Sequence, residues 1–164
     1  LQGFTDAMTI SEYALSKKPK VVLSWAPHVK ALPHAVANSF VQAMQKMDVE
    51  FVITHPQGYE LNPQIVGDTS VIYNQEKAFQ NADFVYVKNW SSYNDYGKVL
   101  NTDPKWMITK NILGNARFMH CLPVRRNLIV EDAVLDSENS LVIQQANNRT
   151  YAAQLVLKKL LENA

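Results

Sequence analysis

The segment Phe118-Met119-His120-Cys121-Leu122-Pro123-Val124-Arg125-Arg126-Asn127 joins a short apolar run to a proline and two arginines. A short apolar run that ends at a proline is typical of a buried strand. In open α/β folds, ligands bind beyond the carboxyl ends of the strands. We therefore expect the functional site around Cys121 and Arg125, where the run stops.

The same pattern continues on both sides of this segment, because apolar runs alternate with stretches of helical periodicity. Strands are predicted at 21–25, 50–54, 70–73, 83–88, 116–121 and 140–144, and helices within 1–16 and at 33–47, 59–66, 75–79, 131–135 and 149–163. Strands that alternate with helices predict βαβ units with right-handed crossovers. We expect one α/β domain, doubly wound and Rossmann-like, with a mainly parallel sheet and helices on both faces.

The composition narrows the class of protein. With 164 residues, 47% hydrophobic and 19% charged, the chain is predicted to be one soluble globular domain with a sizeable core. A net charge of +1 gives no electrostatic footprint for nucleic acid, and no segment resembles a membrane span or a secretory signal. Because a single cysteine cannot form an internal disulfide, we expect a cytoplasmic protein with small-molecule or protein partners, no nucleic acid and no membrane.

Polar side chains follow three of the predicted strands. His28 comes after the first strand, Lys88 ends the strand at 83–88, and Cys121 and Arg125 follow the strand at 116–121. Parallel strands would bring all of them to one edge of the sheet. Singly, a strand-end His or Lys is usually a solvated surface group and a lone Cys is usually a small core residue. Their convergence is what favours a ligand site.

Arg149 is predicted at the start of the last helix. The amino end of a helix favours an anion and disfavours a cation. Either a phosphate bridges Arg149 and the helix end, or the side chain points away into solvent. The same helix has apolar residues on two faces, which predicts contacts beyond this domain.

Three motifs resemble those of one enzyme family. The segment 120–123, His-Cys-Leu-Pro, resembles the same segment of the aspartate and ornithine carbamoyltransferases, and its extension Val-Arg-Arg-Asn is most similar to the branch that acts on N-acetyl or N-succinyl ornithine. The segment 145–149 resembles the family's Glu-Ala-x-Asn-Arg, with Gln145 in place of the acid. Leu1-Gln2 resembles the end of His-Pro-x-Gln.

The resemblance implies that residues 1–164 are the C-terminal, amino-acid-substrate-binding domain, and that the N-terminal carbamoyl-phosphate domain is absent. It also implies a role for each matching residue. Carbamoyl phosphate would be bound by Leu1, Gln2, Cys121, Leu122 through its carbonyl, and Arg149. The amino-acid substrate would be bound by His28, Lys88 and Arg125. Neither a metal nor a cofactor is implied, and Cys121 would be a contact group rather than a nucleophile.

The cations favour an acylated substrate. N-succinylornithine has two carboxylates and no free α-amine, which suits Lys88 and Arg125. Ordinary ornithine enzymes have a Ser-Met-Gly element in this loop, where the chain has Asn89-Trp90. Ile129 stands where the acetyl branch usually has a lysine. The expected substrate is N-succinylornithine, then N-acetylornithine, with ornithine itself as the alternative.

The implied reaction is attack of the δ-amine on carbamoyl phosphate, with loss of phosphate, in arginine biosynthesis. The resemblance implies a homotrimer assembled through the absent domain, and we expect the isolated chain to be catalytically inactive.

Two alternatives belong to other classes of protein. A nucleotide-binding or other non-catalytic ligand-binding α/β module is the first, but the five glycines never form a Gly-x-Gly-x-x-Gly loop after a strand. A hydrolase with Cys121 as nucleophile and His120 as base is the second. Neighbours on a strand point to opposite faces, which makes that pair unfavourable.

Overall fold

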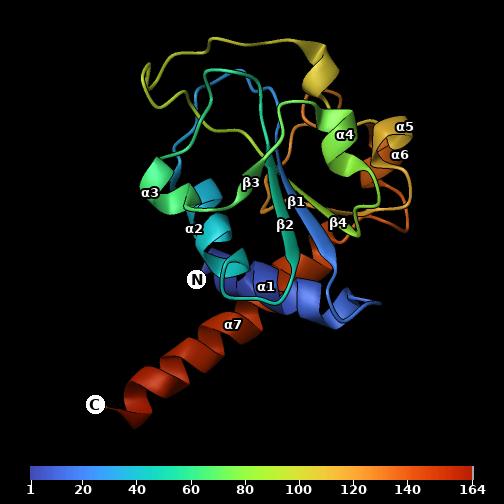
Figure 1. Cartoon of the computed structure of the whole chain (residues 1–164). Helices are drawn as coiled ribbons and strands as arrows, with labels where there is room; N and C mark the ends of the chain where they lie inside the picture. Colours follow the sequence, from blue (N-terminus) through green and yellow to red (C-terminus); the bar gives the residue numbers. More distant parts are fainter. Residues whose placement is uncertain (164) are drawn as a thin grey trace.

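The computed structural model describes residues 1–163 (Figure 1). Its elements follow the chain in the order α1 (Gln2–Tyr13), β1 (Lys20–Trp25), α2 (Ala35–Met44), β2 (Glu50–Thr54), α3 (Pro63–Val66), β3 (Ser70–Val71), α4 (Gln75–Phe79), β4 (Phe84–Lys88), η1 (Pro104–Trp106), α5 (Lys110–Leu113), β5 (Arg117–Met119), α6 (Asp132–Leu135) and α7 (Val142–Glu162). Strands and helices alternate over most of the chain, as the sequence predicts.

The five strands form one parallel sheet in the order β3-β2-β1-β4-β5. The chain enters the sheet at the central strand β1 and adds β2 and β3 on one side of it. It then crosses to the other side of β1 and adds β4 and β5. The order therefore reverses between β1 and β4, where Trp25 pairs with Lys88. In doubly wound folds ligands bind at this reversal, beyond the carboxyl ends of the strands. The predicted fold class is confirmed.

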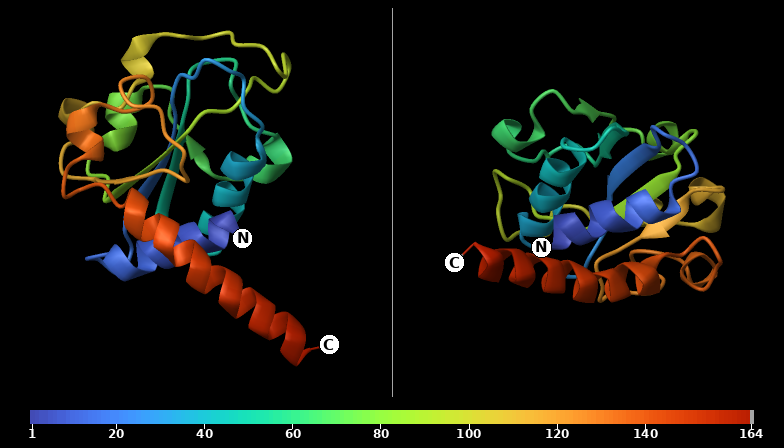
Figure 2. Two further views of the ribbon diagram at one scale, coloured as in Figure 1. Left: turned by 180° about the vertical axis from the view of Figure 1, so that it is seen from behind. Right: turned by 90° about the horizontal axis from the view of Figure 1, so that it is seen from below.

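Helices cover both faces of the sheet (Figure 2). Val21 and Leu23 of β1 belong to the core that contains α1 and α2, whereas Val22 belongs to the core that contains α4, α5 and α6. All three side chains are fully buried. Strands buried on both faces have continuous apolar sequences, which is why the apolar runs predict them well.

The predicted strand at 140–144 is wrong. Ser140 makes only an isolated bridge with Phe118, and helix α7 begins at Val142 rather than at Arg149. A short apolar run cannot be distinguished from the first turn of a buried helix by periodicity alone. Here Leu141 and Val142 are apolar because they pack in the core at the start of α7.

Other elements differ in length from their predictions. The helix predicted at 59–66 is limited to Pro63–Val66, because the Asn62 side chain accepts a hydrogen bond from the Gln64 amide (2.9 Å) and Pro63 occupies the first turn. The short elements η1 and α5 lie in a stretch without a prediction. Thr109 caps α5 by accepting a hydrogen bond from the Ile112 amide (3.4 Å).

Helix α7 packs against α1 at its amino end, and its carboxyl end projects from the body (Figure 1). Apolar side chains on the projecting part are exposed: Tyr151, Leu155, Val156, Leu157, Leu160 and Leu161. No helix within residues 1–163 has the length and apolar character needed to cross a membrane.

Candidate active site

The segments that follow β1, β4 and β5 meet at the carboxyl edge of the sheet. Arg125 Nε donates a hydrogen bond to His28 Nε2 (3.3 Å), and His28 Nδ1, which therefore carries the ring proton, donates to the Lys30 carbonyl (3.0 Å). Burial lowers the pKa of His28, and the positive charges of Arg125, Lys88 and Lys30 lower it further, against a backbone hydrogen bond that raises it. The structure therefore brings together the predicted residues His28, Lys88 and Arg125, which we name the cationic cluster.

Residues 120–123 form a constrained turn after β5. Leu122 has a φ of 49°, and the Leu122–Pro123 peptide bond is cis. The left-handed region is unfavourable for a residue with a side chain, so such a conformation persists only where the surroundings impose it. The Leu122 amide contributes by donating a hydrogen bond to His120 Nδ1 (3.0 Å). This fixes the backbone of Leu122, whose carbonyl is a predicted ligand group.

His120 is buried and neutral. Burial lowers its pKa to about 3, with smaller effects from Lys88 and His28. Because Nδ1 accepts the Leu122 amide, the ring proton lies on Nε2. Within residues 1–163, His120 makes no hydrogen bond to Cys121. This arrangement argues against the hydrolase alternative, in which His120 would take a proton from the Cys121 thiol.

We expect His120 to make the chain less stable in acid. Its folded pKa of about 3 lies below the ordinary value of 6.5, so the unfolded chain binds a proton that the folded chain does not. The free energy of unfolding then falls as the pH drops from 6.5 toward 3, by about 2 kcal/mol at pH 5 from this residue. Urea unfolding of the natural chain and of His120→Asn at pH 7 and pH 5 measures the difference. Asp6 has a raised pKa with the opposite effect, which cancels because both proteins contain it.

A smaller loss of stability in His120→Asn between pH 7 and pH 5 is the expected result. Equal losses in the two proteins would contradict the burial of a neutral His120.

Buried hydrogen bonds connect Gln2 to the end of β5. Gln2 Nε2 donates to Asp6 Oδ1 (2.7 Å), and Gln145 Nε2 donates to the same oxygen (2.7 Å). Gln145 Oε1 accepts a hydrogen bond from the His120 amide (3.0 Å). The predicted residue Gln2 is thus tied to the turn that carries Cys121. Sequence reasoning missed Asp6, whose only local signal is its spacing of one helical turn from Gln2.

Two predicted residues lie outside these contacts. Arg149 is exposed and lies within α7, one turn after Gln145, so the prediction that it stands at a helix N-terminus is wrong. The argument from the helix dipole therefore does not apply to it. Leu1 is also exposed, and its carbonyl accepts the Thr5 amide (3.0 Å). No hydrogen bond or ion pair within residues 1–163 joins Arg149 or Leu1 to the cationic cluster.

The long segment after β4 is anchored to the body beside the site. Trp90 is fully buried, and its indole N–H donates to the Tyr59 carbonyl (2.8 Å). The Tyr59 hydroxyl in turn accepts hydrogen bonds from the amides of Leu100 (3.0 Å) and Asn101 (2.9 Å). These bonds hold the segment at both ends and fix one wall of the site next to Lys88.

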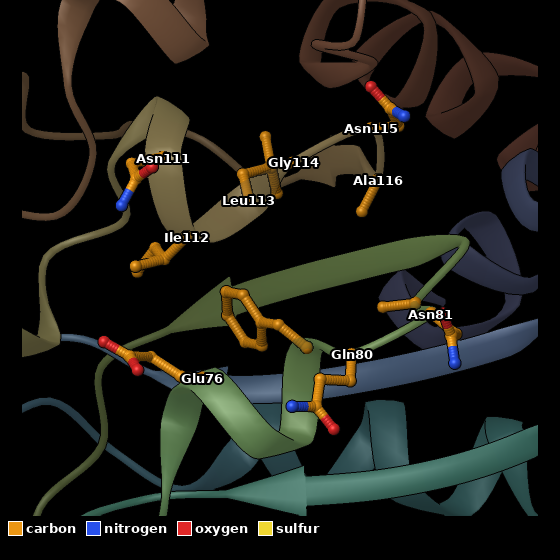
Figure 3. Close-up of a pocket in the computed structure, with 11 residues that line it drawn as sticks. Glu76, Gln80, Asn81, Asn111, Ile112, Leu113, Gly114, Asn115 and Ala116 are labelled. Atoms are coloured by element: carbon orange, nitrogen blue, oxygen red, sulfur yellow. The ribbon is translucent and has the colours of Figure 1, made fainter.

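A cavity of about 440 Å³ lies elsewhere, between α4 and α5 (Figure 3). Ala82 and Ala116, which precede β4 and β5, contribute to its lining and place it at the amino ends of these strands. None of the predicted site residues lines it, so the cavity and the cationic cluster are separate. Within residues 1–163, no group of three or more His, Cys, Asp or Glu side chains is arranged to hold a metal ion.

Cations gathered at the strand reversal of a doubly wound α/β domain are typical of domains that bind small anionic ligands. The family model described as "Aspartate/ornithine carbamoyltransferase, Asp/Orn binding domain" matches residues 33–160. The chain therefore belongs to the aspartate/ornithine carbamoyltransferase family.

Individual relatives agree with this assignment. The chain is 54% identical to N-succinylornithine carbamoyltransferase of Bacteroides fragilis (strain 638R) over 99% of the chain and 53% of that protein. It is 52% identical to the enzyme of the same name of Bacteroides thetaiotaomicron, over 99% of the chain and 52% of that protein. A mutant of N-acetyl-L-ornithine transcarbamylase, solved with carbamyl phosphate and N-succinyl-L-norvaline, matches with a TM-score of 0.81 at 29% identity, over 90% of the chain and 52% of that structure. The chain spans about half the length of these relatives.

Proposed function

We propose that this chain forms the acyl-ornithine-binding domain of a carbamoyltransferase. The complete enzyme would transfer the carbamoyl group of carbamoyl phosphate to the δ-amine of an N-acylated ornithine, with N-succinylornithine favoured over N-acetylornithine. A second domain, N-terminal to this one, would supply the remaining phosphate contacts and the trimer interface. The observation that carries the proposal is the cationic cluster, which contacts no carboxylate within the described residues 1–163.

Arg125 and Arg126 are adjacent in the sequence but differ in whether a carboxylate contacts them. Within residues 1–163, no carboxylate contacts Arg125, Lys88 or His28. Arg126, by contrast, is paired with Asp132 (2.7 Å) and Asp136 (2.6 Å) of the α6 region. Two unpaired cations at one edge of the sheet, Arg125 and Lys88, favour an anionic ligand, and the neutral His28 orients Arg125.

The ion pairs of Arg126 help to hold the turn after β5 against α6. Asn127, with a φ of 56°, donates a hydrogen bond from Nδ2 to Asp132 Oδ2 (2.8 Å), and the Asp132 amide donates to Asn127 Oδ1 (3.1 Å). These bonds and the Arg126 ion pairs fasten the turn to α6. Arg125 is thereby held at the sheet edge, where His28 Nε2 orients its guanidinium.

N-succinylornithine fits the charge of this cluster. Its two carboxylates can be bound by Arg125 and Lys88, and it has no α-ammonium that would require an acidic partner. Its δ-amine would then point toward Cys121 and the Leu122 carbonyl, where carbamoyl phosphate is proposed to lie. Similarity to N-succinylornithine carbamoyltransferases supports the same substrate.

The proposed chemistry depends on position and charge. The neutral δ-amine attacks the carbamoyl carbon, a tetrahedral intermediate forms, and the C–O bond to phosphate breaks as phosphate leaves with the proton that the amine releases. Gln2 and the Leu122 carbonyl would hold the carbamoyl NH₂, and Arg149 would contact the phosphate or the carbamoyl oxygen. Holding the two reactants together in a polar, preorganised site accounts for catalysis without a covalent enzyme intermediate.

We expect the chain alone to form no N-succinylcitrulline from carbamoyl phosphate and N-succinylornithine, because half of the proposed site is missing. Joined to the N-terminal half of the Bacteroides fragilis relative, the same chain should form the product. Mass spectrometry of the ureido product measures both. Acceptors should rank N-succinylornithine first, N-acetylornithine second and ornithine last.

Turnover by the chain alone would show that the second domain is dispensable. Absence of product from the joined protein and from the complete enzyme, with all three acceptors, would refute the proposed function.

A further inference from the structure

Asp6 is a fully buried carboxylate to which the proposed reaction gives no role. Its Oδ1 accepts hydrogen bonds from Gln2 and Gln145, and the buried Tyr86 hydroxyl lies close enough for it and the carboxylate to shift each other's pKa. Burial raises the pKa of Asp6 to about 6, and the interactions with Gln2, Gln145 and Tyr86 offset only part of that effect. Burying a carboxylate costs free energy even when it is hydrogen-bonded, so the stability of α1 does not explain Asp6.

An ionised carboxylate only accepts hydrogen bonds, so it decides which way a neighbouring amide points. Gln2 must turn its NH₂ group toward Asp6, which leaves Oε1 on the side away from the carboxylate. Gln145 is oriented in the same way, and its free Oε1 accepts the His120 amide. The orientation of both glutamines therefore follows from the charge on Asp6.

This orientation matches the needs of a carbamoyl group, whose NH₂ requires acceptors. Gln2 Oε1 is an acceptor, whereas a flipped Gln2 would present NH₂ to NH₂ and form no hydrogen bond. Gln145 acts at the opposite end of the network, because it holds the backbone of the residue before Cys121. One carboxylate thus reaches two separate parts of the proposed carbamoyl phosphate site.

We propose that Asp6 is a positioning residue for carbamoyl phosphate, which fixes the Gln2 amide with Oε1 toward the carbamoyl NH₂ and, through Gln145, holds the strand end that carries Cys121. The proposal rests on the proposed function, in which Gln2 contacts the carbamoyl group. Asp6 itself touches no reactant and acts only through the two glutamines.

A double-mutant cycle in the complete enzyme tests this role. Gln2→Ala, Asp6→Ala and the double variant are compared by the dissociation constant for carbamoyl phosphate, measured by calorimetry. We expect each single change to weaken binding about tenfold or more, and the double change to weaken it by clearly less than the product of the two. Independent effects that multiply would overturn the positioning role.

A second pair of variants avoids the cavity left by Asp6→Ala. Gln2→Glu keeps acceptor oxygens for the ligand but sets a carboxylate against Asp6, so carbamoyl phosphate should bind about tenfold weaker or worse. Asp6→Asn alone should also weaken binding, because its NH₂ group can turn toward Gln2 and release the amide orientation, but it should restore most of the binding lost in Gln2→Glu, because that NH₂ group can donate to the new carboxylate. No recovery in the double variant would overturn the proposal.

The two proposals fail differently. Unchanged carbamoyl phosphate binding in Gln2→Ala would refute the contact at Gln2 and with it the role of Asp6, whereas product formation by the complete enzyme would still support the proposed function. Weakened binding in Gln2→Ala with unchanged binding in Asp6→Ala would refute only the role of Asp6.

Discussion

Replacing Arg125 by alanine in the complete enzyme is expected to weaken N-succinylornithine binding by about 2 to 4 kcal/mol, or about 30- to 900-fold. The guanidinium has no carboxylate partner within residues 1–163 and is already oriented by His28 Nε2 at 3.3 Å. A substrate carboxylate that meets it therefore replaces water rather than an internal ion pair. Calorimetry with N-succinylornithine measures the loss directly.

Arg126→Ala is the matched control, because it removes the same charge one residue away. Arg126 is an exposed side chain engaged by Asp132 and Asp136. These ion pairs are exposed and weak, and Asn127 still fastens the turn to Asp132 without them, so substrate affinity should change by less than about fivefold. Equal losses in the two variants would mean that net charge governs binding rather than a contact at Arg125. Unchanged binding in Arg125→Ala would remove Arg125 from the site.

The sequence predicted the sheet well because its strands are buried on both faces. The run Val21-Val22-Leu23 is apolar throughout and fully buried, as is typical of a parallel strand with helices on both of its faces. The start of α7 was not predictable in the same way. Its N-cap residue is Leu141, which makes no side-chain capping bond, so the sequence contains no signal that a helix begins there.

The cationic cluster was predictable because each member follows a strand, and parallel strands end at one edge. The sequence could not show that Arg126 is paired and Arg125 is not, because the pairing depends on where the α6 region places Asp132 and Asp136. The hydrogen bond between Asp6 and Gln145 could not be predicted from the sequence either. These residues lie 139 positions apart, and no local pattern joins them.

Gly3 is a further feature that only the packing reveals, and Gly3→Ala is expected to lower the free energy of unfolding by about 3 kcal/mol. A Cβ atom at Gly3 would overlap the Ser39 backbone carbonyl oxygen and lie 2.8 Å from Ser39 Oγ. The Gly3 amide also donates a hydrogen bond to that hydroxyl (3.2 Å). Helices α1 and α2 must therefore separate, which also displaces Gln2 and Asp6.

A loss of stability in Gly3→Ala would identify the clash between α1 and α2, because alanine normally stabilises a helix by about 1 kcal/mol relative to glycine. Urea unfolding of the natural chain, Gly3→Ala, Ser39→Gly and the double variant separates the two sources of the clash. Ser39→Gly removes the hydroxyl but leaves the carbonyl, so it should restore little of the loss. An unchanged or increased stability of Gly3→Ala would show that α1 and α2 lie farther apart, and α1 would then have room to move the Gln2 amide away from the end of β5.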